Sequence, residues 1–319
     1  MPAWPRLTIV TPSFNQGAYL EQTIRSVLDQ GYPNLEYFVV DGGSSDQSPE
    51  IIRRYAKRLA WWVSEPDRGQ AEAINKGLRR ATGDFVAWIN SDDYYLPGAF
   101  KAAVETLMHQ PRVGLVYGDV LAVDEAGQPT NRLSYGSWGL EGLLRFQIIG
   151  QPAVFMRRET LRRVGYLDVR YHYLLDHQLW IRMAAAAGAQ YVPELWAAAR
   201  FHAEAKNVAQ AAAFGREALD IAAWMQWQDG LRAHFRKDRK RILAGAQRLN
   251  GRYLSEGGDY GGALRAYAAC ARLHMPTALA DWKRIAYTCA AGMGGARLRT
   301  WFDRQRSART ARRLPPNLD

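Results

Sequence analysis

The stretch Phe85-Val-Ala-Trp-Ile-Asn-Ser-Asp-Asp93 decides the fold. Its first six residues carry no formal charge and are rich in β-branched and aromatic side chains, which is typical of a buried strand in a parallel sheet. Two adjacent carboxylates, Asp92 and Asp93, end this strand. Open α/β sheets bind ligands beyond the carboxyl ends of their strands, and a divalent cation relieves the repulsion between neighbouring carboxylates. We therefore expect Asp93 to hold Mg²⁺ or Mn²⁺ beside a diphosphate; the alternative is an acidic turn that caps a helix beginning near Pro97.

The same order of strand, polar loop and helix is found three times before this stretch. The expected strands are Leu7–Thr11, Glu36–Val40 and Trp61–Ser64, and the expected helices are 18–30, 48–59 and 71–80. Asp41 directly follows the second strand and Asp67 lies shortly after the third. A single aspartate at a strand end is usually a helix cap, but the recurrence is poorly explained by capping alone. The alternation predicts an α/β fold, a doubly wound and mostly parallel sheet with these loops along one edge.

The remainder of the chain divides near residue 204. Up to that point we expect a helix to His109, a strand over Val113–Val120, a hairpin over 124–137, a glycine loop and strand over 150–156, and a helix over 177–187. Beyond it the sequence is rich in alanine and arginine and has no strand signal. Residues 251–271 resemble one helical hairpin of the tetratricopeptide type. The predicted domains are residues 1–204 and a basic, α-helical extension over 205–319.

Composition restricts the class of protein. The 319 residues are 48% hydrophobic and carry a formal net charge of +11, which favours an anionic partner such as a nucleotide, a nucleic acid or an acidic lipid surface. Only two cysteines occur, so no disulfide framework or zinc spacing is present. No apolar stretch has the length of a signal peptide core or a bilayer span. We expect a cytoplasmic protein, peripheral at the inner face of the cell membrane if its arginine-rich tail (residues 297–313) contacts lipid.

Four motifs, taken in order, resemble the family 2 glycosyltransferases with the GT-A fold. They are Thr11-Pro12-Ser13-Phe14-Asn15, Asp41-Gly42-Gly43-Ser44-Ser45-Asp46, Ser64-Glu65-Pro66-Asp67-Arg68-Gly69-Gln70 and Asn90-Ser91-Asp92-Asp93. The resemblance covers about residues 7–202. It implies a Rossmann-like GT-A domain and a metal-assisted, inverting transfer of a sugar from a nucleotide diphosphate donor.

The resemblance also implies roles for individual residues. A nucleotide-sugar site is implied for Thr11, Pro12, Phe14, Asp41, Arg68, Gln70, Asp92 and Gln151. Within this set Thr11 and Asp41 match positions that hold the nucleobase, and Asp92 matches the position that hydrogen-bonds the ribose. Asp93 matches the metal ligand, and Gly150-Gln151-Pro152 resembles the flexible loop near the donor sugar and the acceptor. Ser91 stands where the fuller acidic motif has aspartate, which leaves the metal ligand intact.

The resemblance implies chemical roles for two further residues, one as a base and one as a metal ligand. Asp176 matches the catalytic-base carboxylate, although Leu175 precedes it where the family often has glutamate. His202 resembles a C-terminal histidine that completes the metal shell; a structural or exposed histidine is the alternative. An acceptor hydroxyl is too weakly acidic to attack unaided, so the base must accept its proton as attack proceeds.

The expected function is therefore transfer of a sugar from a UDP-, dTDP- or GDP-linked donor to a glycan or lipid-linked acceptor in cell-surface polysaccharide, O-antigen or glycolipid assembly. A nucleotidyltransferase is one alternative, but the loop over Thr11–Gly17 has no lysine or arginine for a triphosphate. A non-catalytic, nucleotide-sugar-binding scaffold is the other, and the presence of both Asp93 and Asp176 argues against it. Nucleic-acid binding is not expected, because no recognised motif accompanies the positive charge.

Overall fold

The computed structural model describes residues 4–202 and 210–293. Its contacts divide the chain into two compact units. Unit 1 contains residues 1–123, 132–140 and 149–200, and unit 2 contains residues 124–131, 141–148 and 201–319. The structure does not describe the residues around the predicted domain boundary between 204 and 205. It does not describe the arginine-rich tail either.

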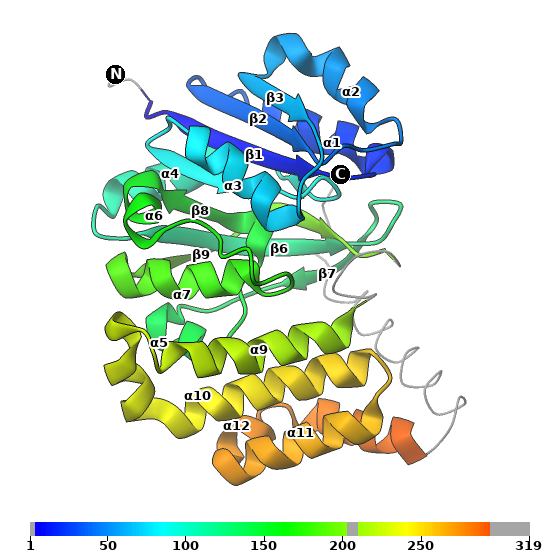
Figure 1. Ribbon diagram of the computed structural model, residues 1–319, viewed down its shortest axis with the longest axis vertical. Helices are drawn as coiled ribbons and strands as arrows, with labels where there is room; N and C mark the ends of the chain where they lie inside the picture. The colour runs from blue at the N-terminus through cyan, green and yellow to red at the C-terminus, as the bar shows by residue number, and fades with distance from the viewer. Residues whose placement is uncertain (1–3, 203–209, 294–319) are drawn as a thin grey trace. The chain divides into compact units, whose positions relative to one another are not determined.

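Unit 1 is built on one mixed sheet whose path runs β3-β2-β1-β4-β8-β6-β9-β5, with β7 paired to β6 (Figure 1). The strands are β1 (Leu7–Ser13), β2 (Leu35–Asp41), β3 (Trp61–Ser64), β4 (Phe85–Trp88), β5 (Tyr94–Tyr95), β6 (Leu115–Val123), β7 (Pro129–Leu133), β8 (Val154–Arg157) and β9 (Ala189–Arg200). The first four pair in parallel, as the repeating pattern predicts.

The second half of the sheet is different, because β8 pairs antiparallel with both β4 and β6. β9 is parallel to β6, and β5 is antiparallel to β9. β9 is one continuous strand of twelve residues, and its pairing with β6 has a register irregularity beside Asp119.

The helices of unit 1 follow their strands as expected. They are α1 (Gly17–Leu28), α2 (Ser48–Tyr55), α3 (Gln70–Arg80), α4 (Ala99–His109), α6 (Arg158–Val164) and α7 (Leu175–Ala187), with short 3-10 turns η1 (Ala56–Arg58) and η2 (Gln151–Ala153). Ile24 and Val27 of α1 are fully buried with Ile9 of β1 in the main core. At about 25 cal/mol for each Å² of apolar area removed from water, these faces supply most of the stabilisation.

Unit 2 contains α5 (Gly139–Leu144, which starts in unit 1), α9 (Ala211–Met225), α10 (Asp229–Glu256), α11 (Tyr260–Leu273) and α12 (Met275–Leu279). The helices α9, α10 and α11 lie side by side (Figure 1). The resemblance to a tetratricopeptide hairpin corresponds to the end of α10 and α11. Asp259 caps α11 by accepting a hydrogen bond from the backbone N–H of Gly262. In the parts of the chain that the structure describes, no helix is long and apolar enough to cross a bilayer.

Candidate active site

The carboxyl ends of β1, β2 and β3 meet around Asp41. This carboxylate is fully buried and accepts hydrogen bonds from the Ser44 backbone N–H (3.0 Å), the Ser44 hydroxyl (2.5 Å) and the Ser64 hydroxyl (2.6 Å). A carboxylate offers about four lone-pair positions, so these donors leave one for a ligand. Asp41 therefore holds the end of β3 and the glycine loop together at the place where the nucleobase is expected.

The loop after β1 is tied to the loop after β2. Asn15 adopts a left-handed backbone conformation (φ 51°), which asparagine tolerates better than most residues. Its side-chain oxygen accepts from the Ser45 backbone N–H at 2.9 Å, and its own N–H donates to the Ser44 hydroxyl at 2.8 Å. The sequence alone assigned Asn15 no role, although its position inside the first motif could have indicated one.

The side chains of the first motif have different environments. Thr11 is buried and its hydroxyl is hydrogen-bonded to that of Tyr37 at 2.9 Å, so it faces the core. Pro12 is buried in β1, whereas Phe14 is 60% exposed at the carboxyl edge. Ser13 pairs in register with Asp41, and its buried hydroxyl has no hydrogen-bond partner among the described residues. We add Ser13 to the candidate ligand contacts, a position that its motif could have suggested.

A chain of hydrogen bonds joins the loop after β3 to the acidic turn after β4. Gln70, the first residue of α3, donates to the side-chain oxygen of Asn90 at 2.7 Å. Asn90 in turn donates to Asp93 at 3.5 Å. Arg68 lies in the same loop with an exposed side chain and is paired with Glu72 at 2.9 Å. Two of the sequence motifs are thus physically connected.

Asp93 is buried, and its environment disfavours its charged form. One carboxylate oxygen accepts from the backbone N–H of Arg200 at 2.9 Å. Burial, followed by repulsion from the adjacent Asp92, raises the pKa of Asp93 well above its usual range. A cation would relieve both effects. This is the chemistry expected of a metal-binding carboxylate, although structural burial alone also raises a pKa.

Arg200 is the main residue at this site that sequence reasoning missed. Its buried side chain donates to the Asp92 carbonyl (3.1 Å) and to Gln22 (2.5 Å), and it lies over the rings of Tyr19 (4.8 Å) and Tyr94 (5.9 Å). The end of β9 is thereby fixed against the acidic turn. An arginine following three alanines at a strand end was the only sequence signal.

Gln151 lies at the end of β4, and its implied role near the donor sugar and the acceptor stays a prediction. Its side-chain nitrogen donates to the Trp88 carbonyl at 2.8 Å, and its buried side-chain oxygen has no partner among the described residues. A Cβ on the neighbouring Gly150 would lie 2.5 Å from the hydroxyl of Tyr135. Only glycine allows this approach, which brings a further loop against the Gln151 segment.

Asp176 occupies the first turn of α7. Its carboxylate is partly buried and accepts from the backbone N–H of His177 at 2.7 Å. Trp180, one turn or about 5.4 Å further along the helix, stacks on Trp88 with ring centroids 5.0 Å apart. Trp88 is five residues before Asp93, a span of at most about 17 Å even for extended chain. The stack thus fixes α7 against the end of β4, the strand that leads to the acidic turn.

A loop of unit 1 beside Gly150 is anchored by a buried carboxylate that sequence reasoning did not identify. Asp119 of β6 accepts from the guanidinium of Arg132 (2.6 and 2.9 Å), from the Tyr135 backbone N–H (3.1 Å) and from the Tyr191 hydroxyl (2.8 Å). Tyr117 donates from its hydroxyl to the carbonyl of Gly136. This loop therefore has a defined position although it lacks regular secondary structure.

The candidate ligands for a metal are two carboxylates, which do not form a complete coordination shell by themselves. His202 is buried, lies two residues beyond β9 and falls in unit 2, and its role stays a prediction. Within the described ranges, no three His, Cys, Asp or Glu side chains are grouped closely enough to hold a metal. Mg²⁺ is usually bound through one or two carboxylates together with substrate phosphates, so Asp92 and Asp93 fit a cation that arrives with a diphosphate.

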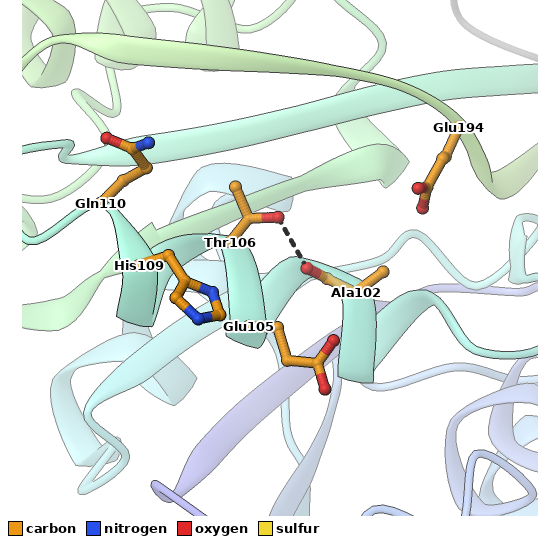
Figure 2. A pocket seen from close by; sticks show the side chains of 6 residues that line it. All are labelled: Ala102, Glu105, Thr106, His109, Gln110 and Glu194. Atoms are coloured by element: carbon orange, nitrogen blue, oxygen red, sulfur yellow. Dashed lines mark hydrogen bonds between the residues drawn. The ribbon is translucent and has the colours of Figure 1, made fainter.

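A hollow of unit 1 lies away from these residues. A cavity of about 310 Å³ is lined by Ala102, Glu105, Thr106, His109, Gln110 and Glu194 (Figure 2). The Thr106 hydroxyl donates to the Ala102 carbonyl, and is thus used within α4. None of the candidate site residues lines this cavity, and we assign it no ligand.

Comparison with known proteins identifies the family and the fold. The family model described as Glycosyl transferase family 2 matches residues 8–166. A Bacillus subtilis glycosyltransferase named for teichuronic acid biosynthesis, TuaG, is 31% identical over 176 residues, which cover 53% of this chain and 69% of that protein.

Solved structures with the same fold include two nucleotide-sugar complexes. Staphylococcus aureus TarS 1-349 in complex with UDP-GlcNAc superimposes with a TM-score of 0.58 at 16% identity, over 88% of this chain and 92% of that one. The Pyrobaculum calidifontis mannosyltransferase PcManGT, in complex with GDP-Man and Mn²⁺, gives 0.63 at 23% identity, over 98% and 87%. At these identities the likeness shows the GT-A fold alone. Together with the sequence match, it shows that the chain belongs to glycosyl transferase family 2.

Proposed function

We propose that this glycosyltransferase moves a sugar from a nucleotide diphosphate donor to an acceptor hydroxyl with inversion at the anomeric carbon. The observation that carries the proposal is that Asp41, Asp93 and Gln151 lie along the sheet edge where β2, β1 and β4 end, with the helix of Asp176 fixed to the end of β4 by the Trp88–Trp180 stack. Ligands bind at this edge of an open α/β sheet.

The nucleoside half of the donor is assigned to the ends of β1, β2 and β3. The remaining lone pair of Asp41 would accept from an imide N–H of the base, and the exposed ring of Phe14 supplies a stacking surface. Arg68, whose side chain is 85% exposed, can leave Glu72 at small cost because solvent screens an ion pair on the surface. The TarS structure contains UDP-GlcNAc and the PcManGT structure contains GDP-Man, so the base of the donor stays open between UDP, dTDP and GDP.

The diphosphate is assigned to the acidic turn, with Asp93 and, as the sequence resemblance implies, His202 as candidate groups toward a divalent cation. The adjacent Asp92, for which the resemblance implies a hydrogen bond to the ribose, is a further candidate group. When bound there, Mg²⁺ or Mn²⁺ would supply Lewis-acid stabilisation of the charge on the leaving diphosphate. Asn90 and the Arg200 N–H orient the Asp93 carboxylate through the hydrogen bonds described above. This orientation is what a second layer of contacts contributes to a metal ligand.

Asp176 is assigned the proton transfer. The acceptor oxygen forms a bond to the anomeric carbon while the bond from that carbon to the diphosphate oxygen breaks, and the acceptor proton passes to the Asp176 carboxylate. Attack and departure on opposite sides of the carbon invert its configuration. The free Gln151 side-chain oxygen can accept a hydrogen bond from a sugar hydroxyl and so fix the donor for this displacement.

The acceptor is proposed to be a glycan or lipid-linked glycan of the cell surface, assembled on the cytoplasmic side of the membrane. The name of the Bacillus subtilis relative, which refers to teichuronic acid biosynthesis, supports this class of acceptor. A contact of the arginine-rich tail with the membrane surface is part of the same proposal, although that tail lies outside the described residues.

A panel of UDP-, dTDP- and GDP-linked sugars tests the function. We expect one donor to be hydrolysed or transferred with Mn²⁺ or Mg²⁺ present and to be inert with EDTA. Asp176→Asn should abolish turnover and leave nucleotide affinity within about twofold, because the base acts on the acceptor side. Asp168→Asn is the matched control, since that carboxylate is paired with Arg170 and has no place at the site. Equal loss of nucleotide affinity and turnover in Asp176→Asn would mean that the base is misassigned.

A further inference from the structure

Unit 2 carries a concentrated positive charge on one segment of α10. Six basic and two acidic side chains lie between Asp229 and Arg241. Four of the basic residues, Arg236, Lys237, Arg239 and Lys240, are exposed, and each is without an ion-pair or hydrogen-bond partner in the described parts of the chain. We call these four residues the α10 cationic segment.

The two acids of this region do not neutralise the cationic segment. Asp238 is paired with Arg145, at a kink inside α10, and lies 3.8 Å from Arg241. Asp229 is paired with Arg232 at 3.2 Å. Leu231, Phe235 and Ile242 form the inward side of the helix, and the cations are left on the outward side. An anionic surface is the complementary partner of such a segment.

An exposed apolar face lies directly beside the cationic segment. It consists of Met275 and Leu279, one turn apart on α12, and Trp282, which follows the turn after α12; they are 54%, 58% and 59% exposed. This apolar face is joined to α10 by the Arg241 side chain, which donates to His274 at 3.3 Å, and by the Arg248–Asp281 pair at 3.8 Å. Figure 1 shows α12 next to α10. Lys283 lies 5.6 Å from the centre of the Trp282 ring, so a cation also borders the apolar face.

We propose that the α10 cationic segment and this apolar face together form a docking surface for an anionic lipid bilayer. Cations attract acidic head groups, and a patch of Trp, Leu and Met can enter the boundary between head groups and acyl chains. A nucleic acid would use the cations but would leave three large apolar side chains in water. The combination therefore favours lipid, and it needs neither turnover nor the arginine-rich tail.

Vesicle flotation of the full chain tests this surface. We expect binding to vesicles of phosphatidylcholine with phosphatidylglycerol, little binding to phosphatidylcholine alone, and release at 1 M salt, where the screening length is about 3 Å. The quadruple variant R236Q/K237Q/R239Q/K240Q should partition roughly 10²–10³-fold more weakly, at about fivefold for each basic residue near the surface. All four side chains are exposed, so thermal unfolding should be unchanged.

A matched control removes the same charge from unit 1. The variant R53Q/K57Q/R58Q/R112Q changes four exposed basic residues and should bind these vesicles nearly as well as the natural sequence. The double variant L279S/W282S keeps every cation and should also weaken binding, because it removes the apolar anchor. The proposal is overturned if both quadruple variants bind alike, if L279S/W282S binds unchanged, or if the chain binds duplex DNA at low salt but no vesicle.

Discussion

Trp88 at the end of β4 stacks on Trp180 of α7, with ring centroids 5.0 Å apart and planes 22° apart. Both side chains are fully buried. The carbonyl of Trp88 also accepts the hydrogen bond from Gln151. One aromatic pair therefore fixes three parts of the candidate site: the strand that leads to Asp93, the loop of Gln151 and the helix of Asp176.

Replacing Trp180 by alanine should affect both stability and turnover. A buried tryptophan changed to alanine costs roughly 3–5 kcal/mol of unfolding free energy because it leaves a cavity and removes the stacked partner. The helix that positions Asp176 would also lose its contact with β4, so turnover should fall further than the folded fraction. Urea unfolding and donor turnover, measured on the same preparation, check this expectation.

Trp180→Phe is the matched variant, because it keeps an aromatic ring against Trp88 while it reduces the buried area. It should retain most of the stability and most of the turnover. A Trp180→Ala protein that turned over normally, once corrected for its folded fraction, would contradict the idea that the stack positions the base.

Most of the first half of the fold follows from sequence pattern. The strand over Trp61–Ser64 was predicted with its observed bounds, and the parallel pairing of β1 to β4 follows from the alternation of strands and helices. These elements depend on local periodicity and on the short connections between them. The loops with Asp41 and Asp93 come together for the same reason, since the carboxyl ends of parallel strands share one edge.

The parts that sequence could not predict are contacts between distant segments. The Arg200 N–H meets Asp93 across 107 positions, and the Trp88–Trp180 stack depends on where α7 packs. The antiparallel insertion of β8 between β4 and β6 has no signature in the apolar pattern of 153–156. Side-chain periodicity indicates which face of a strand is buried, but it does not indicate which strand pairs with it or whether the pairing is parallel or antiparallel.

Asp93→Asn should separate metal binding from stability. The raised pKa of Asp93, caused by burial and by Asp92, means that its ionised form destabilises the folded protein at neutral pH. The neutral amide removes that cost and can still accept from the Arg200 N–H, so thermal stability should hold or rise. Changes around a metal ligand cost about 10–100-fold in affinity, and changing the ligand itself should cost at least as much.

Calorimetry with the preferred nucleotide, with and without Mn²⁺, provides the measurement. Asp84→Asn serves as a control at the opposite end of the same strand. If Mn²⁺ enhances nucleotide binding equally in the natural sequence and in Asp93→Asn, then Asp93 is not the ligand and its burial is structural.

Asp119→Asn should loosen the loop beside Gly150. The change replaces a charge-assisted contact with Arg132 by a neutral one and weakens the bonds from Tyr135 and Tyr191, at a cost of roughly 2–3 kcal/mol. Donor hydrolysis should persist while transfer falls, because this loop lies on the Gln151 side of the site. Arg132→Gln leaves the buried carboxylate with its other two donors but without its counter-charge, so it should cost at least as much stability and loosen the same loop. Similar losses in both activities would place the loop outside acceptor positioning.

Glu36→Gln should give a stability difference that depends on pH. Burial alone would raise the pKa of Glu36, but hydrogen bonds from Thr8 and Thr82, together with the charge of Arg6, lower it below its usual 4.5. Because the folded-state pKa is depressed, the stabilisation is present above pH 4.5 and is lost as pH falls through the folded value. The variant should be about 1 kcal/mol less stable at pH 7, and the difference should shrink steadily as the pH falls below 4.5. Urea midpoints measured across this range would contradict the expectation if the difference stayed constant.

The two cysteines should differ in their reaction with thiol reagents. Cys270 of α11 is fully buried against Ala244 and Ala278, and burial raises the pKa of its thiol to about 11. The thiolate is the reactive form, so at pH 8 about one Cys270 thiol in a thousand would be ionised even before access is considered. Cys289 is partly exposed and should react first.

Mass spectrometry after brief iodoacetamide treatment should find one label in the folded protein, on Cys289, and two labels in urea. The variant Cys289→Ser should then remove the fast label. Labelling of Cys270 at the same rate as Cys289 under native conditions would show that α11 opens away from α10 far more readily than its buried packing implies.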